Sequence, residues 1–117
     1  MKIVVVGAGA VGGWYGGLLA LQGHEVHLVT RSDYSTIRQH GLRLRDAQGV
    51  RLVQPASAQP DTATIGETDL IIIAAKATAN AELPALIKPL LKPSSLLLTL
   101  QNGMGNVENL IGLVPSA

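Results

Sequence analysis

Four short apolar runs are spaced along the chain, and each predicts a strand of a buried sheet. They cover residues 3–6, 25–29, 69–75 and 95–100, and valine, isoleucine and leucine dominate them. The first, third and fourth runs lack strict alternation between apolar and polar residues, which is typical of strands with both faces covered. We therefore expect a parallel sheet enclosed on both sides.

Two helices are predicted between the first three runs. The first spans residues 11–22, and the second ends at about His40 with Ser32 or Asp33 as its N-cap. A glycine follows each helix, at Gly23 and Gly41, where a positive φ commonly ends a helix.

A third helix is predicted after the strand at 69–75. Its apolar residues recur at i, i+3, i+4, i+7 and i+8 and are Leu83, Leu86, Ile87, Leu90 and Leu91. Pro84 fits the first turn of this helix, whereas Pro89 should kink or end it. A further helix start is predicted at 106–111. Strands that alternate with helices indicate an α/β fold.

Between residues 42 and 52 the pattern changes to alternation around a turn at 46–49. This predicts a β-hairpin with one solvated face, in which three leucines alternate with three arginines: Leu42, Leu44, Leu52, Arg43, Arg45 and Arg51. The arginines could form an anion site, but we favour a solvated strand face. Residues 55–64 are predicted to be a polar connector.

Composition narrows the possible classes of protein. The 117 residues suit one domain, and 47% hydrophobic against 15% charged residues excludes disorder. A net charge of +1 argues against a nucleic-acid binder. The absence of cysteine excludes disulfides, zinc ribbons and thiol nucleophiles. No apolar run is long enough for a signal peptide or a membrane helix, so we expect a soluble cytoplasmic protein with no membrane partner.

A glycine-rich motif follows the first predicted strand and opens the first predicted helix. It is Gly7-Ala8-Gly9-Ala10-Val11-Gly12, a G-x-G-x-x-G sequence. Gly7 allows a tight turn, Gly9 allows a pyrophosphate to approach the backbone, and Gly12 allows the helix to pack closely on the sheet. A turn without a ligand is the alternative. We predict a Rossmann-type, doubly wound, mainly parallel sheet that binds a dinucleotide, with the hairpin as a small insertion.

The end of the second strand indicates which dinucleotide is bound. NAD-binding domains usually place an acidic residue there to accept the ribose 2′-hydroxyl. This chain has Thr30-Arg31-Ser32 instead. The Arg31 guanidinium can pair with a 2′-phosphate, with Ser32 and Arg38 as possible helpers, so NADP is the predicted cofactor. Alternatively, Arg31 is an ordinary surface residue and Asp33 is the displaced acid.

Two polar residues follow buried strands, where a doubly wound sheet places its ligand crevice. Lys76 follows the third strand and Asn102 follows the fourth. A lysine there can attract a carboxylate or phosphate, and an asparagine can hydrogen-bond a carboxamide, hydroxyl or carbonyl. Solvated loop residues are the alternative for both. The histidines lack metal-ligand spacing and are predicted to be surface or packing residues: His24, His27 and His40.

Several of these motifs together resemble the ketopantoate reductase (2-dehydropantoate 2-reductase) family over the whole chain. The motifs are residues 1–13, the turn at 23–26, Arg31, Lys76-Ala77 and Gln101-Asn102-Gly103-Met104-Gly105. The resemblance implies an NADPH-dependent reduction of a 2-oxo acid in pantothenate biosynthesis. It places residues 7–12 on the pyrophosphate, Arg31 on the 2′-phosphate, and Lys76 and Asn102 near the nicotinamide and the substrate as catalytic residues.

The resemblance also implies a second, helical domain that carries the general-acid lysine and most substrate contacts. The chain is expected to be the NADP-binding domain, residues 1–117, of such a two-domain enzyme, and to catalyse little by itself. Two alternatives remain open, namely another two-domain dehydrogenase acting on a different substrate and a stand-alone nucleotide-binding or sensing module. An oligomer is possible.

Overall fold

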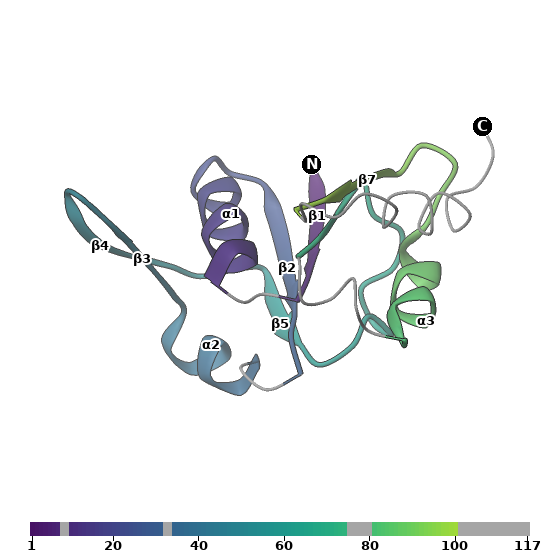
Figure 1. The fold of residues 1–117 in the computed structure, drawn as a ribbon, viewed down its shortest axis with the longest axis horizontal. Coiled ribbons are helices and arrows are strands. Elements are labelled where there is room, and N and C mark those ends of the chain that lie inside the picture. The colour runs from purple at the N-terminus through teal and green to yellow at the C-terminus, as the bar shows by residue number, and fades with distance from the viewer. Residues whose placement is uncertain (8–9, 32–33, 75–80, 101–117) are drawn as a thin grey trace.

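The computed structural model describes residues 1–7, 10–31, 34–74 and 81–100 (Figure 1). Its strands are β1 (Lys2–Val6), β2 (Glu25–Val29), β3 (Leu42–Asp46), β4 (Gly49–Val53), β5 (Ser57–Gln59), β6 (Leu70–Ile73) and β7 (Leu96–Thr99). Its helices are α1 (Ala10–Leu21), α2 (Tyr34–His40), α3 (Leu83–Ile87) and the 3₁₀ helix η2 (Lys88–Leu90). The helix start expected at 106–111 lies outside the described residues.

A parallel sheet forms the centre of the fold, as the sequence predicts. Five strands pair in the order β5-β2-β1-β6-β7, and each neighbouring pair is parallel. The chain adds β2 and β5 on one side of β1, then returns to add β6 and β7 on the other side. This reversal of strand order is the topological switch point of a doubly wound fold.

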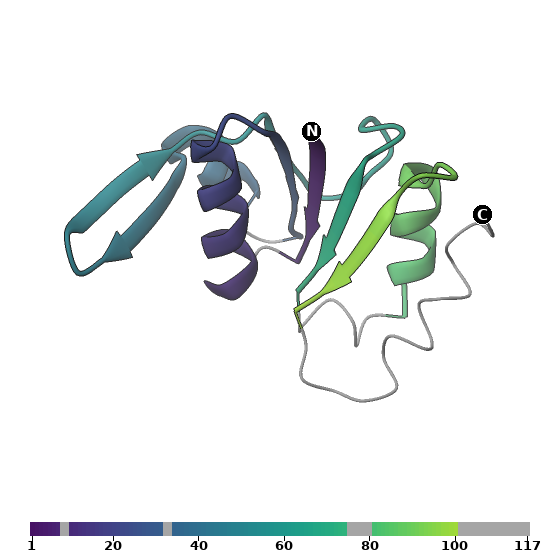
Figure 2. The same cartoon turned by 90° about the horizontal axis from the view of Figure 1, so that it is seen from above.

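Helices lie on both faces of the sheet (Figure 2). On one face, α3 and η2 pack their apolar side chains on β1 and β6 through Leu83, Ile87 and Leu90. On the other face, Ile37 of α2 and Leu19 of α1 join the core formed by β1, β2, β5 and β6. Because both faces of β1 are covered, Ile3 and Val4, which point to opposite faces, are both fully buried.

The helix ends also follow the predictions. Gly23 and Gly41 have φ values of 94° and 75°, so each takes the left-handed conformation expected after a helix. Pro84 lies in the first turn of α3, and Pro89 lies within η2, where the α-helix has already ended. Among the helices of the described residues, none is long and apolar enough to cross a membrane.

The predicted hairpin forms, but the face assigned to Leu52 was wrong. Leu42 pairs with Val53 and Leu44 with Arg51, so Leu52 lies opposite Arg43 on the other face. Leu44 is buried while Leu52 is 61% exposed. The two-residue turn at 47–48 fixes this register, and a register change of one residue moves every side chain to the other face.

Two other expectations are corrected at the edges of the sheet. The connector at 55–64 contains β5, a short strand that pairs in parallel with β2 although its sequence, Ser57-Ala58-Gln59, is mostly polar. The strand predicted at 95–100 to be buried on both faces forms as β7, but Leu96 and Leu98 are 61% and 47% exposed. β7 pairs with β6 only, among the described residues, and one of its faces is open.

Candidate functional site

The five parallel strands end at the same level, and we call this row of strand ends the carboxyl edge. Backbone hydrogen bonds continue past it: Gly7 N–H donates to Val29 O (2.7 Å), and Ala74 N–H donates to Val6 O (3.0 Å). Leu100 N–H donates to Ile73 O in the same way (2.9 Å). Ligands of doubly wound folds bind beside this edge at the switch point, which lies here between β1 and β6.

Gly7 is the first residue beyond β1, and its backbone conformation makes the tight turn toward α1. Its φ is 81°, a value that residues with a Cβ rarely adopt. Ala10, Val11 and Gly12 are the first residues of α1, whose first turn contains no acidic side chain. The positive end of the α1 dipole is therefore not neutralised from within the helix, which is the arrangement that favours an anion. Ala8 and Gly9 lie outside the described residues.

Arg31 lies two residues beyond β2, also at the carboxyl edge. Its guanidinium forms an ion pair with the carboxylate of Glu82, the residue that immediately precedes α3. The two side chains are 60% and 62% exposed, so both the pair and its surroundings are open to solvent. The Arg31 guanidinium at the carboxyl edge is thus already engaged with a carboxylate of the same chain.

Sequence reasoning missed Glu82. It stands 51 positions after Arg31, and no motif or periodicity connects the two residues. The pairing arises because β2 and β6 flank β1, which brings the segments following β2 and β6 together at one edge. The related signal in the sequence is that no acidic residue directly follows β2, which leaves that position open to a carboxylate from elsewhere in the chain.

Of the other side chains predicted to line the site, Arg38 lies within the described residues. Lys76, Asn102 and Ser32 lie outside the described residues. Arg38, considered as a helper of Arg31, donates from Nε to Ala58 O (2.6 Å), and its guanidinium stands 5.1 Å from the Tyr34 ring centroid. These contacts hold α2 against β5 and give Arg38 a structural role.

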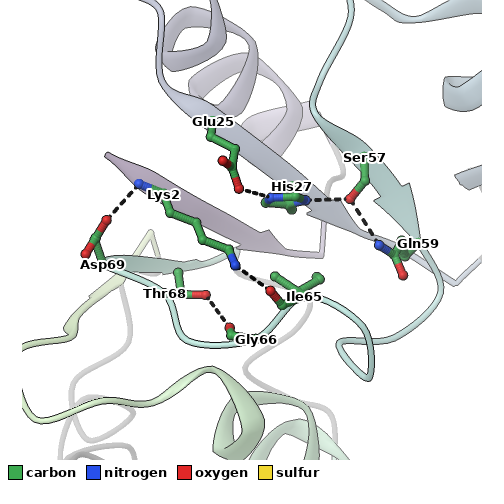
Figure 3. Close-up of polar contacts among 9 residues, drawn as sticks. All are labelled: Lys2, Glu25, His27, Ser57, Gln59, Ile65, Gly66, Thr68 and Asp69. Carbon is green, nitrogen blue, oxygen red and sulfur yellow. Dashed lines mark hydrogen bonds and ion pairs between the residues drawn. The ribbon is translucent and has the colours of Figure 1, made fainter.

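A second polar cluster lies across β2 and β5 (Figure 3), on the sheet face that α3 covers. His27 Nε2 donates to Glu25 Oε2 (2.7 Å), and His27 Nδ1 lies 2.6 Å from Ser57 Oγ. Gln59 joins the cluster by donating to Ser57 Oγ (3.2 Å). The hydrogen bond from His27 lowers the pKa of the Glu25 carboxyl. The cluster links β2 to β5, and the packing role expected for His27 agrees with this geometry.

Polar contacts also close the amino-terminal edge of the sheet (Figure 3). The Asp69 carboxylate accepts hydrogen bonds from Lys92 Nζ and from the backbone N–H of Lys2 (2.8 Å). These bonds lower the pKa of Asp69, with the Lys92 contact as the larger cause. Lys2 Nζ in turn donates to Ile65 O. These contacts hold the amino-terminal ends of the strands together, at the edge of the sheet opposite the switch point.

Comparison with known protein families gives one match that covers nearly the whole chain. A family model described as "Ketopantoate reductase PanE/ApbA" matches residues 3–117. Among curated relatives, a 2-dehydropantoate 2-reductase of Nostoc sp. is 35% identical over 114 residues. That match covers 97% of this chain and 36% of the relative, so the chain spans about a third of the relative's length.

Solved structures share the fold. The 2-dehydropantoate 2-reductase of Geobacter metallireducens superposes with a TM-score of 0.84 at 36% identity, covering 97% of this chain and 38% of that one. A D-mandelate dehydrogenase, solved as a ternary complex with NADH and anilino(oxo)acetate, gives 0.82 at 29% identity, covering 98% and 38%. The Rossmann-type architecture with its hairpin is therefore that of the amino-terminal third of such enzymes.

Proposed function

Because the chain belongs to the ketopantoate reductase family, we propose that it is the NADP-binding domain of a two-domain 2-oxo acid reductase. The parent enzyme reduces 2-dehydropantoate or a related 2-oxo acid to the 2-hydroxy acid. Residues 1–117 form its cofactor domain, and a second domain supplies the general acid. The length of the relatives, almost three times that of this chain, supports this division of labour.

The described residues fit a dinucleotide in two places. At the switch point, the positive-φ Gly7 leads from β1 to the positive end of α1, which suits a pyrophosphate. Residues 7–12 are proposed to hold that group, with Gly9 and Gly12 in the roles that the motif gives them. At the end of β2, the exposed Arg31 guanidinium suits a 2′-phosphate.

Substrate binding is assigned to the segments after β6 and β7. Lys76 comes three residues after Ile73, the last residue of β6, and Asn102 comes three residues after Thr99, the last of β7. A bound nicotinamide supplies the hydride. Lys76 is proposed to attract the carboxylate of the 2-oxo acid, and Asn102 to orient its carbonyl by hydrogen bonding.

A proton must also reach the oxygen of the reduced carbonyl, from an acid within hydrogen-bond distance. In this proposal the acid is a lysine of the second domain, so the chain by itself binds cofactor and turns over little or no substrate. Detectable reduction of 2-dehydropantoate by residues 1–117 alone would contradict this part.

The observation that carries the proposal is the Gly7 turn between β1 and α1 at the switch point. The test is a calorimetric titration of the chain with NADPH and, in parallel, NADH. We expect tighter binding of NADPH, and a loss of about tenfold or more in Arg31→Ala, since hydrogen bonds to charged groups contribute about 1.5–3 kcal/mol. Equal or preferential NADH binding would reduce Arg31 to a surface residue. Failure to bind either would contradict nucleotide binding.

One observation favours a second candidate, an NADH-linked dehydrogenase of 2-hydroxy acids. The D-mandelate dehydrogenase with the same fold was solved with NADH. The preference measured in the titration decides between the two candidates, because only a 2′-phosphate needs the Arg31 guanidinium.

A further inference from the structure

The guanidinium assigned to the 2′-phosphate is held by a carboxylate of the same chain. We propose that Glu82 is a specificity-determining residue, which competes with the 2′-phosphate for Arg31 and narrows the preference for NADPH over NADH. This inference rests on the proposed nucleotide-binding function and adds to it a residue from a different part of the chain.

The competition follows from the ion pair and its position. Arg31 follows β2, Glu82 precedes α3, and their side chains meet at the carboxyl edge beside the switch point. A phosphate that binds the Arg31 guanidinium must displace the Glu82 carboxylate or share the guanidinium with it. Two anions on one cation repel each other, so the affinity for a phosphorylated ribose falls below what Arg31 alone would give.

The same carboxylate can serve an unphosphorylated ribose. Dinucleotide-binding domains that use NAD place a carboxylate at the end of the second strand, where it accepts the ribose 2′-hydroxyl. No acid stands directly at the end of β2 in this sequence, where Thr30-Arg31 follows Val29. Glu82, the residue that precedes α3, brings a carboxylate next to Arg31. The Arg31–Glu82 pair thus holds a guanidinium that can bind a ribose 2′-phosphate and a carboxylate that can accept a ribose 2′-hydroxyl.

The side chain of Glu82 is 62% exposed and makes no side-chain capping hydrogen bond to α3. The variant Glu82→Gln keeps the size of the side chain and removes its negative charge. Thermal unfolding of each variant checks that the chain is folded before any titration.

The test is calorimetric titration of the 117-residue chain and of Glu82→Gln with NADPH and with NADH. We expect NADPH to bind about two- to fivefold more tightly to Glu82→Gln, the range that an exposed ion pair can supply. NADH should bind with unchanged or lower affinity, so the ratio of the two affinities rises. Glu67→Gln, which removes the charge of another exposed acid, should leave that ratio unchanged.

A double-mutant cycle shows whether the effect acts through Arg31. In the Arg31→Ala background, Glu82→Gln should no longer change NADPH affinity. If NADPH binding depends on Arg31 but Glu82→Gln leaves the affinity ratio unchanged, this inference is wrong and the proposed function stands. An equal gain for both nucleotides also overturns it, because that result indicates a general charge effect. Failure of the folded wild type and variant to bind NADPH overturns both proposals.

Discussion

Gly17 of α1 lies directly against Leu44 of β3. A Cβ placed on Gly17 would stand 2.7 Å from Leu44 Cδ2 and 2.9 Å from Leu44 Cδ1, closer than non-bonded carbon atoms approach a Cβ in proteins. Leu44 is 2% exposed, whereas Val50 and Leu52 of the same hairpin are more than half exposed. Leu44 therefore attaches the hairpin to α1 by fitting over a helical glycine.

We expect Gly17→Ala to destabilise the fold by about 1–2 kcal/mol, despite the better helix propensity of alanine. The added methyl group forces Leu44 from its position, and overpacking of this kind costs about 1–3 kcal/mol. Urea unfolding followed by circular dichroism measures the change. In a Leu44→Ala background, the same Gly17→Ala substitution should be stabilising by about 0.5–1 kcal/mol. Equal effects in the two backgrounds would show that the contact is unimportant.

Substitutions at Gly7 and Gly23 can separate the effect of backbone strain on stability from an effect on ligand binding. Their φ values are 81° and 94°, so replacing either by alanine should cost about 1–2 kcal/mol of stability. Only Gly7→Ala should also weaken NADPH binding, because Gly23 follows the far end of α1. Calorimetric titration at a temperature where both variants are folded makes the comparison. Equal NADPH affinities in the two variants would argue against a binding role for Gly7.

Ser95 joins two segments before β7 through one buried hydroxyl. Its Oγ donates to Thr68 O (2.7 Å) and accepts from the backbone N–H of Lys92 (2.9 Å), and the residue is 6% exposed. Ser95→Ala should lower the free energy of unfolding by about 1–3 kcal/mol, because it leaves buried polar groups unpaired. The neighbouring, exposed Ser94 is the control, and Ser94→Ala should change stability by less than about 0.5 kcal/mol. Similar losses in both would contradict the role of the buried hydroxyl.

Asp69 should make the stability of the chain depend on pH in the acid range. Its hydrogen bonds lower its pKa below the ordinary value of about 3.9, so the charged form is favoured in the folded state. The resulting stabilisation is complete above that ordinary value and is lost as the pH falls through the lower pKa of the folded state. Asp69→Asn should therefore have a lower melting temperature than the wild type at neutral pH.

The two melting temperatures should converge as the pH falls below about 4. Glu67→Gln serves as a control, because Glu67 is exposed and should give an offset that changes little with pH. A constant difference between the wild type and Asp69→Asn across the pH range would show that the carboxylate charge is not what stabilises this edge.

β1 and β6 were predictable because burial on both faces leaves a continuous apolar run: the run at 3–6 lies within β1, and the run at 69–75 contains β6. The run at 25–29 coincides with β2, although Glu25 and His27 interrupt its apolar residues. β5 escaped prediction because it lies at the edge of the sheet, where Ser57 and Gln59 bond to other polar groups instead of packing in the core. The opposite error occurred at β7, where a run of leucines predicted burial on both faces, but Leu96 and Leu98 are exposed.

The candidate site was predictable only where it depends on short segments of the chain. The turn at Gly7 and the start of α1 follow from one motif, and both are confirmed as structural elements. Leu52 was placed on the wrong face because the alternation of leucine and arginine was carried across the turn without pairing the strands, whereas a turn at 46–49 already places Leu52 opposite Arg43. The pairing of Arg31 with Glu82 depends on strand order, which no local pattern contains.

The position of β1 at the centre of the sheet also has a consequence for synthesis of the chain. β1 is made first, but its neighbour β6 follows it by about 67 residues, the separation between Lys2 and its partner Asp69. At about 5–20 residues per second, a ribosome needs roughly 3–13 seconds to cover that interval. During this time β1 can pair with β2 on one side only. Its other edge keeps unpaired backbone N–H and C=O groups between apolar side chains, which is a site for association with other chains until β6 is made.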